Sequence, residues 1–204
     1  MRRITLALIA LMICTAGSAQ ESLLAKISLD HKLTTTEAAA AVLIGNALGI
    51  KVEWVIGASR DSGVHLHNIG PAIVISHHSG YSLHDVLRQK PKGEGWGNVA
   101  KRMGMHPGTF NKMRVKGNDF ENIIWINMLG DKYGFSERSF FELSKRGLKR
   151  DEIVAAVVMS NGKKDKLEAS VTIVLASRPK ATTGAAASGK GNGKGKGKGR
   201  GKGG

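Results

Sequence analysis

Residues 93–116 read GEGWGNVAKRMGMHPGTFNKMRVK, and this stretch decides the fold class that the sequence indicates. Ala100 and Gly104 stand four residues apart, as at the junction of two short helices joined by a tight glycine turn. We therefore expect helices near 96–103 and 107–114. Apolar residues flank the turn at positions that would hold two such helices together: Val99, Met103, Met105, Phe110 and Met113.

The same kind of turn recurs along the chain. A glycine followed by an apolar residue ends one helix, because glycine adopts the left-handed conformation there and the next side chain packs back on the last turn. A serine and an acid then favour a new helix, as at Ser82 with Asp85 and at Ser136 with Glu137. The glycines that we expect to form these structural turns are Gly49, Gly80, Gly104, Gly134 and Gly147.

These signals predict an all-α protein, a compact bundle of short glycine-capped helices. Thr34 and Glu37 form a capping-box pattern ahead of an alanine-rich run. Pro71 and Pro107 suit the first turn of a helix, where a missing N–H has no effect. The run 169–175, SVTIVLA, leaves a strand open as an alternative. Helices are expected near 35–48, 51–60, 70–79, 82–90, 96–103, 107–114, 119–133, 136–146, 149–160 and 164–176.

The chain begins MRRITLALIALMICTAGSAQ, which is the pattern of an export leader. Two arginines precede an apolar run from Ile4 to Cys14, and small residues follow up to Ala19. The run is shorter than the roughly 20 residues that a membrane span requires. We therefore expect a signal peptide at 1–19, and a mature chain that starts at Gln20 and lies in the periplasm or outside the cell. A helix of the core is the alternative, and stable membrane insertion after cleavage is not expected.

Positive charge is strong and unevenly placed. The formal net charge is +15, and the sixteen acids all lie between Glu21 and Glu168. The end of the chain, GKGNGKGKGKGRGKGG, offers nothing to bury and carries the large folding entropy of glycine. We expect a helical domain at 20–178 and a disordered Gly/Lys-rich basic tail at 179–204.

Anionic polymers are the partners that this charge distribution favours, because neutralising them releases counterions. The polymer would be an envelope polysaccharide, lipopolysaccharide or nucleic acid, bound with low specificity. A solubilising tail without a dedicated partner is the alternative. The candidate polyanion-binding residues are Arg88, Lys90, Lys92, Lys101, Arg102, Lys112, Arg114 and Lys116 in the body, and Lys190, Lys194, Lys196, Lys198, Arg200 and Lys202 in the tail.

The segment from Ser79 to Gly104 resembles a group of uncharacterised small exported bacterial proteins. The resemblance rests on the motif G-x-G-W-G-x-[IV]-A-x-x-[LM]-G, present here as GEGWGNVAKRMG at 93–104, and it extends over about residues 70–116. It implies export and an all-helical body, and it implies no activity. The same residues resemble the helix-turn-helix of DNA-binding domains, which makes a DNA-binding protein an alternative function. In that case Thr109, Asn111, Lys112 and Arg114 would face DNA.

Five histidines fall within twenty residues, and imidazole is a ligand for zinc, copper and nickel. No HExxH motif accompanies them, so a weak metal site in an envelope protein is only a further alternative and no cofactor is expected. The mature chain would also lack cysteine ligands, since Cys14 is the only cysteine. These histidines are His65, His67, His77, His78 and His84.

Signatures of catalysis are not found in the sequence. There is no nucleophile-elbow motif, and the acids read as ordinary surface residues. GEGWG at 93–97 lacks both the preceding strand and the GK[ST] ending of a phosphate loop. We instead expect these glycines to bring a helix in at a tight angle while Trp96 fills the core. The sequence therefore favours a non-enzymatic protein.

Overall fold

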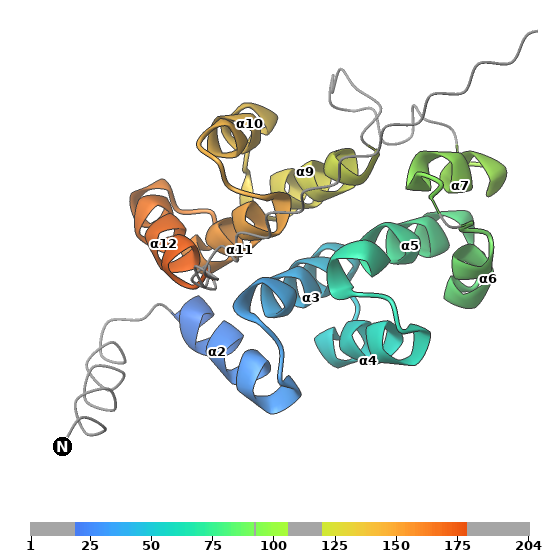
Figure 1. The fold of residues 1–204 in the computed structure, drawn as a ribbon, viewed down its shortest axis with the longest axis horizontal. Helices are drawn as coiled ribbons and strands as arrows, with labels where there is room; N and C mark the ends of the chain where they lie inside the picture. Colours follow the sequence, from blue (N-terminus) through green and yellow to red (C-terminus); the bar gives the residue numbers. More distant parts are fainter. Residues whose placement is uncertain (1–18, 92, 106–119, 179–204) are drawn as a thin grey trace, which may run out of the picture.

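The computed structural model describes residues 19–91, 93–105 and 120–178. Within these ranges the chain forms helices and no strand, which confirms the all-α class (Figure 1). The helices are α2 (Ala19–His31), α3 (Thr35–Leu48), α4 (Val52–Ser62), α5 (Leu66–Ser79), α6 (Leu83–Arg88), α7 (Trp96–Arg102), α9 (Phe120–Tyr133), α10 (Glu137–Lys145), α11 (Arg150–Ser160) and α12 (Lys164–Ala176).

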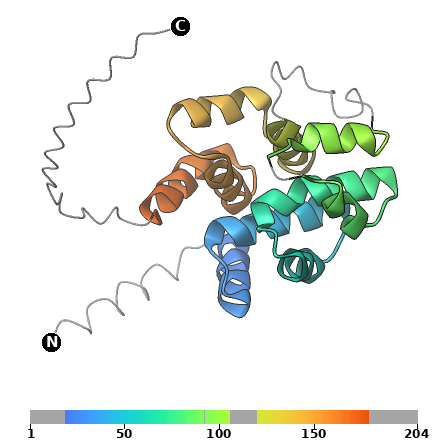
Figure 2. The ribbon, with the colours of Figure 1, turned by 45° about the vertical axis from the view of Figure 1, so that its right-hand side comes forward.

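Two helices, α3 and α11, form the centre of the bundle. Eight consecutive residues of α3, from Ala38 to Gly45, are buried, and so are nine of α11, from Glu152 to Ser160. A helix that is apolar on all sides requires neighbours all round. The two helices pack on each other, and α2, α4, α5, α9 and α12 surround them (Figures 1 and 2).

Small residues bring the surrounding helices close to this centre. A Cβ atom built at Gly70 on α5 would lie 2.8 Å from Cζ2 of Trp125 on α9, nearer than real side chains approach. Trp125 is 1% exposed, so its ring could not move aside without disturbing the core. Gly70 therefore sets the spacing between α5 and α9.

The helix ends follow the expected capping chemistry. Thr34 and Glu37 form the capping box of α3, and the hydroxyls of Ser82 and Ser136 accept backbone N–H groups of α6 and α10. The five turn glycines have φ angles in the left-handed region: 67° at Gly49, 75° at Gly80, 75° at Gly104, 63° at Gly134 and 87° at Gly147.

Three details differ from the sequence expectations. Helix α2 was not expected, although Leu24 and Ile27 give it a buried face. Helix α5 begins at Leu66 rather than 70, because Leu66 and Ile69 are already buried, and Pro71 therefore lies inside the helix instead of in its first turn. The strand alternative for 169–175 is wrong, since α12 runs through it.

Several expectations fall outside the described residues. They concern the leader up to residue 18, the helix at 107–114 with Pro107, and the tail at 179–204. In the parts of the chain that the structure describes, no single helix is long and apolar enough to cross a membrane; α3 and α4 pass that test only as a pair, and they are bent by 119°.

Candidate functional site

The basic edge of the molecule comprises Arg88, Lys90, Lys101 and Arg102, which belong to α6, α7 and the loop between them. These two short helices lie on the right-hand side of Figure 1, away from α12. Trp96 opens α7 and is 4% exposed, so it fills the core as expected and anchors the edge to the bundle. The buried Trp96 therefore fixes the position of α7 and of the charged side chains that it carries.

Arg102 has a structural role within this edge. Its guanidinium binds both carboxylate oxygens of Glu94, at 2.6 and 2.8 Å, and also donates to the backbone oxygen of Gln89. The hydrogen bond from Arg102 lowers the pKa of Glu94 and raises that of Arg102. Since the bidentate pair satisfies most of its donors, Arg102 is less available to an external anion than the sequence analysis expected.

The other three cations of the edge differ in solvent exposure and in their partners within the protein. Arg88 lies 3.4 Å from the carboxylate of Asp85 in an exposed pair, which water screens strongly. Lys90 is half-buried, and its Nζ atom lies 5.2 Å from the ring centroid of Trp96. Lys101 is exposed and makes no ion pair within the described residues. Lys101 is therefore the most available of the four, and Arg88 follows.

Lys92, Lys112, Arg114, Lys116 and the six tail cations lie outside the described residues, as do Thr109 and Asn111. Of the expected helix-turn-helix, the structure describes α7 and the turn, where Val99, Ala100, Met103 and Met105 are buried. The apolar residues on the first side of the turn thus pack as expected.

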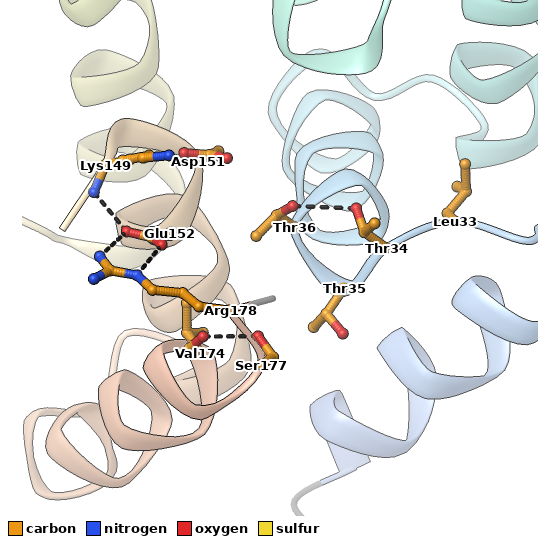
Figure 3. A pocket seen from close by; sticks show the side chains of 10 residues that line it. All are labelled: Leu33, Thr34, Thr35, Thr36, Lys149, Asp151, Glu152, Val174, Ser177 and Arg178. Atoms are coloured by element: carbon orange, nitrogen blue, oxygen red, sulfur yellow. Dashed lines mark hydrogen bonds and ion pairs between the residues drawn. The ribbon is translucent and has the colours of Figure 1, made fainter. Parts of the chain in front are cut away.

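A cavity of about 540 Å³ opens where the N-termini of α3 and α11 meet the end of α12 (Figure 3). Its charged groups largely neutralise one another. Arg178 binds both oxygens of Glu152 at 2.6 Å and donates to the backbone oxygen of Gly147, while Glu152 accepts the backbone N–H of Lys149. This network joins the end of α12 to the start of α11.

Two of the hydroxyls around the cavity, those of Thr34 and Ser177, have internal partners. Thr34 donates to Glu37, and Ser177 donates to the backbone oxygen of Val174. The hydrogen bond from Arg178 lowers the pKa of Glu152, which keeps this carboxylate ionised in its buried position. The bonds of Arg178, Glu152 and Lys149 make this cavity a joint between the start of α11 and the end of α12.

The five histidines do not gather into a metal site. Among the described residues, no three His, Cys, Asp or Glu side chains stand close enough to hold a metal ion. His77 and His78 contact each other edge to face, with ring centroids 5.3 Å apart. His67 instead packs beside Trp125, and burial lowers its pKa. The metal-binding alternative therefore has no three-ligand group in this part of the chain.

Two grooves that the sequence analysis did not anticipate flank Trp54 on α4. One, of about 320 Å³, lies toward α3 and α5 and includes Lys51, Ser76 and His77. The other, of about 370 Å³, lies toward α6 and includes Asp61 and His84. Trp54 lines both grooves and is 50% exposed. The sequence feature that could have indicated these grooves is Trp54 itself, a large aromatic residue next to the buried pair Val55 and Ile56.

Comparison of the chain with protein-family models, with curated proteins and with solved structures found no match. The likeness of residues 70–116 to small exported proteins therefore stays a prediction.

Proposed function

We propose that this is an exported, non-enzymatic helical protein that associates with anionic polymers through its basic edge and its Gly/Lys-rich tail. The observation that carries the proposal is the concentration of charge at 88–116, where eight cations accompany one acid. That acid, Glu94, is paired with Arg102. The remaining cations of the segment therefore give it a net positive field toward a partner.

The short helices α6 and α7 suit low-specificity binding. Arg88 in α6 and Lys101 in α7 are exposed at the surface. A few buried side chains fix each helix to the bundle, namely Val86 in α6 and Trp96, Val99 and Ala100 in α7. Attraction between such cations and a polyanion depends on charge density rather than on a shaped pocket. The polymer would be envelope polysaccharide, lipopolysaccharide or nucleic acid.

Retention on heparin resin tests the proposal and separates the two basic regions. The full-length chain is compared with an edge variant, Arg88→Gln with Lys101→Gln, and with a tail variant in which Lys190, Lys194, Lys196, Lys198, Arg200 and Lys202 become Gln. We expect wild type to elute at the highest salt and both variants earlier. Elution of wild type at low salt would overturn the proposal, and equal elution of wild type and the tail variant would remove the tail from it.

A helix-turn-helix DNA-binding protein is the second candidate, favoured by the buried contacts of Met103 and Met105 around Gly104. It requires that the chain stay in the compartment of the genome. The N-terminus of the endogenous protein separates the two candidates. A mature chain that starts near Gln20 supports export, whereas an intact cytoplasmic chain that starts at Met1 supports the DNA-binding protein.

A further inference from the structure

We propose that helix α4 is a dimerisation surface, on which a second copy of this chain packs its own α4 in the antiparallel direction. Helix α4 lies on the outside of the bundle, and Val55 and Ile56 are its buried residues (Figures 1 and 2). Trp54 is half exposed, whereas Trp96 and Trp125 are buried. An exposed indole between two grooves is typical of a surface that a protein partner covers.

The outward residues of α4 form one stripe along the helix. Lys51, Trp54, Ala58 and Asp61 follow one another at intervals of three or four residues, and Gly57 lies beside Ala58, so all of them share one side of the helix. Lys51 and Asp61 are exposed at the two ends of the stripe, and neither forms an ion pair within the described residues. The stripe therefore carries one large and two small residues between opposite charges.

This order of residues is complementary to itself when the helix is reversed. In a two-fold interface, a residue that contacts a second residue of the partner is matched by the same contact in reverse. With the two-fold axis at the level of Ile56, Lys51 faces Asp61 of the second copy, and Trp54 faces Ala58 of the second copy. Opposite charges meet at both ends, and a large residue meets a small one on either side of the axis. One lysine and one aspartate also balance, which suits a second copy better than a charged polymer.

The groove beside Ala58 has room for the indole of the second copy. Its volume is about 370 Å³, and its apolar lining includes Gly57, Ala58, Leu83 and Leu87. A tryptophan that enters an apolar pocket of a partner buries a large area and is among the residues that contribute most to an interface. Each copy would therefore insert Trp54 into this groove of the other.

Gly57 lies inside α4 without a steric reason among the described residues. Glycine weakens the interior of a helix and is favoured where a neighbour approaches closely. At Gly45 an added Cβ would lie 2.9 Å from the backbone oxygen of Ile50, and at Gly70 it would lie 2.8 Å from Trp125. At Gly57 it would meet no heavy atom of the described residues within 4 Å. The space outside Gly57 is therefore open to a close partner helix, and a second α4 would occupy it.

Sedimentation equilibrium of the full-length chain over a range of concentrations tests the proposal. We expect wild type to dimerise and Trp54→Ala to weaken the dimer at least about tenfold. Gly57→Leu should abolish the dimer, because the new side chain would collide with the second α4. It should keep the helix content of wild type in circular dichroism, since the new side chain has space within its own chain and leucine favours a helix.

Reversal of the charges tests the antiparallel arrangement. Lys51→Glu alone brings two acids together at each end of the interface, and Asp61→Lys alone brings two lysines together. Each should weaken the dimer by about three- to tenfold. Lys51→Glu combined with Asp61→Lys should restore the affinity of wild type. A double variant that is no tighter than the single variants would overturn the antiparallel pairing.

The matched control is Leu29→Ala on α2, which also removes a large exposed apolar side chain and should leave dimerisation unchanged. Wild type that stays monomeric at about 100 μM would overturn the proposal, and so would a dimer that Gly57→Leu leaves intact. Acrylamide quenching of tryptophan fluorescence reports mainly on Trp54, because the other two tryptophans are buried. A monomer in which acrylamide quenches this fluorescence poorly would show that another segment of the same chain covers the grooves, which also contradicts the dimer.

Discussion

The central pair, α3 and α11, and the basic edge, on α6 and α7, differ in how many of their side chains are buried. The central helices bury eight and nine residues in succession, and all of these except Gly45, Glu152 and Ser160 belong to the hydrophobic core. The edge helices have six and seven residues and bury only Val86, Trp96, Val99 and Ala100. Stability should therefore be concentrated in the central pair, and the edge should tolerate changes of charge that alter binding alone.

Truncation of a central side chain should have the largest effect on stability. Leu43 on α3 is fully buried, so Leu43→Ala leaves a cavity that its neighbours fill only in part. We expect a loss of about 3 kcal/mol in the free energy of unfolding, measured by chemical denaturation. Leu29→Ala, at a position 79% exposed, should change it by less than about 0.5 kcal/mol. The folded Leu43→Ala variant should be retained on heparin resin as strongly as wild type. Weaker retention would show that the central helices affect binding as well as stability.

The turn that ends α7 should be the point where the edge is most sensitive to mutation. Gly104 has a φ angle of 75°, and a Cβ built there would meet no heavy atom of the described residues within 4 Å. The penalty for a side chain is therefore one of backbone conformation, about 1–2 kcal/mol for Gly104→Val. Gly104→Asn should be less damaging, because asparagine tolerates the left-handed region. Equal melting temperatures for wild type and Gly104→Val would show that this turn is not as described.

A smaller effect should appear as a pH dependence of stability that arises at His67, near the start of α5. Burial of His67 lowers its pKa, although Asp151 and Glu37 oppose the shift. The unfolded chain therefore binds a proton that the folded chain resists, and stability falls as the pH drops below the unfolded histidine pKa of about 6.5. His67→Gln should flatten the dependence of unfolding free energy on pH between about 7.5 and 5.5. The exposed His84→Gln is the control, and a dependence unchanged by His67→Gln would contradict the assignment.

The sequence predicted those features that follow from local chemistry. Helix ends were well placed where a capping residue or a glycine marks them, as at Thr34 and Gly104. The start of α5 was misplaced because Pro71 was assumed to mark a first turn, whereas burial of Leu66 and Ile69 determines where the helix begins. The start of α5 depends on tertiary contacts of Leu66 and Ile69, which the local sequence does not show.

The candidate site was less predictable, because its properties depend on residues that are distant in sequence. Arg102 and Glu94 are eight residues apart, and only the folded loop brings them together, so a count of charges gives Arg102 the same weight as Lys101. The grooves beside Trp54 arise where α3, α5 and α6 approach α4. Nothing in the local sequence around Trp54 indicates those neighbours.

The salt dependence of polyanion binding tests most directly the central claim, that the cations of the basic edge contribute to binding through their position and not through net charge alone. The edge variant Arg88→Gln with Lys101→Gln is compared with a second double variant, Lys163→Gln with Lys166→Gln. The latter removes two charges from the exposed start of α12, on the far side of the bundle (Figures 1 and 2). Both variants have the same net charge. We expect the slope of log affinity against log salt concentration to fall by about 1–2 for the edge variant only. Equal changes in both variants would show that net charge, and not the basic edge, determines binding.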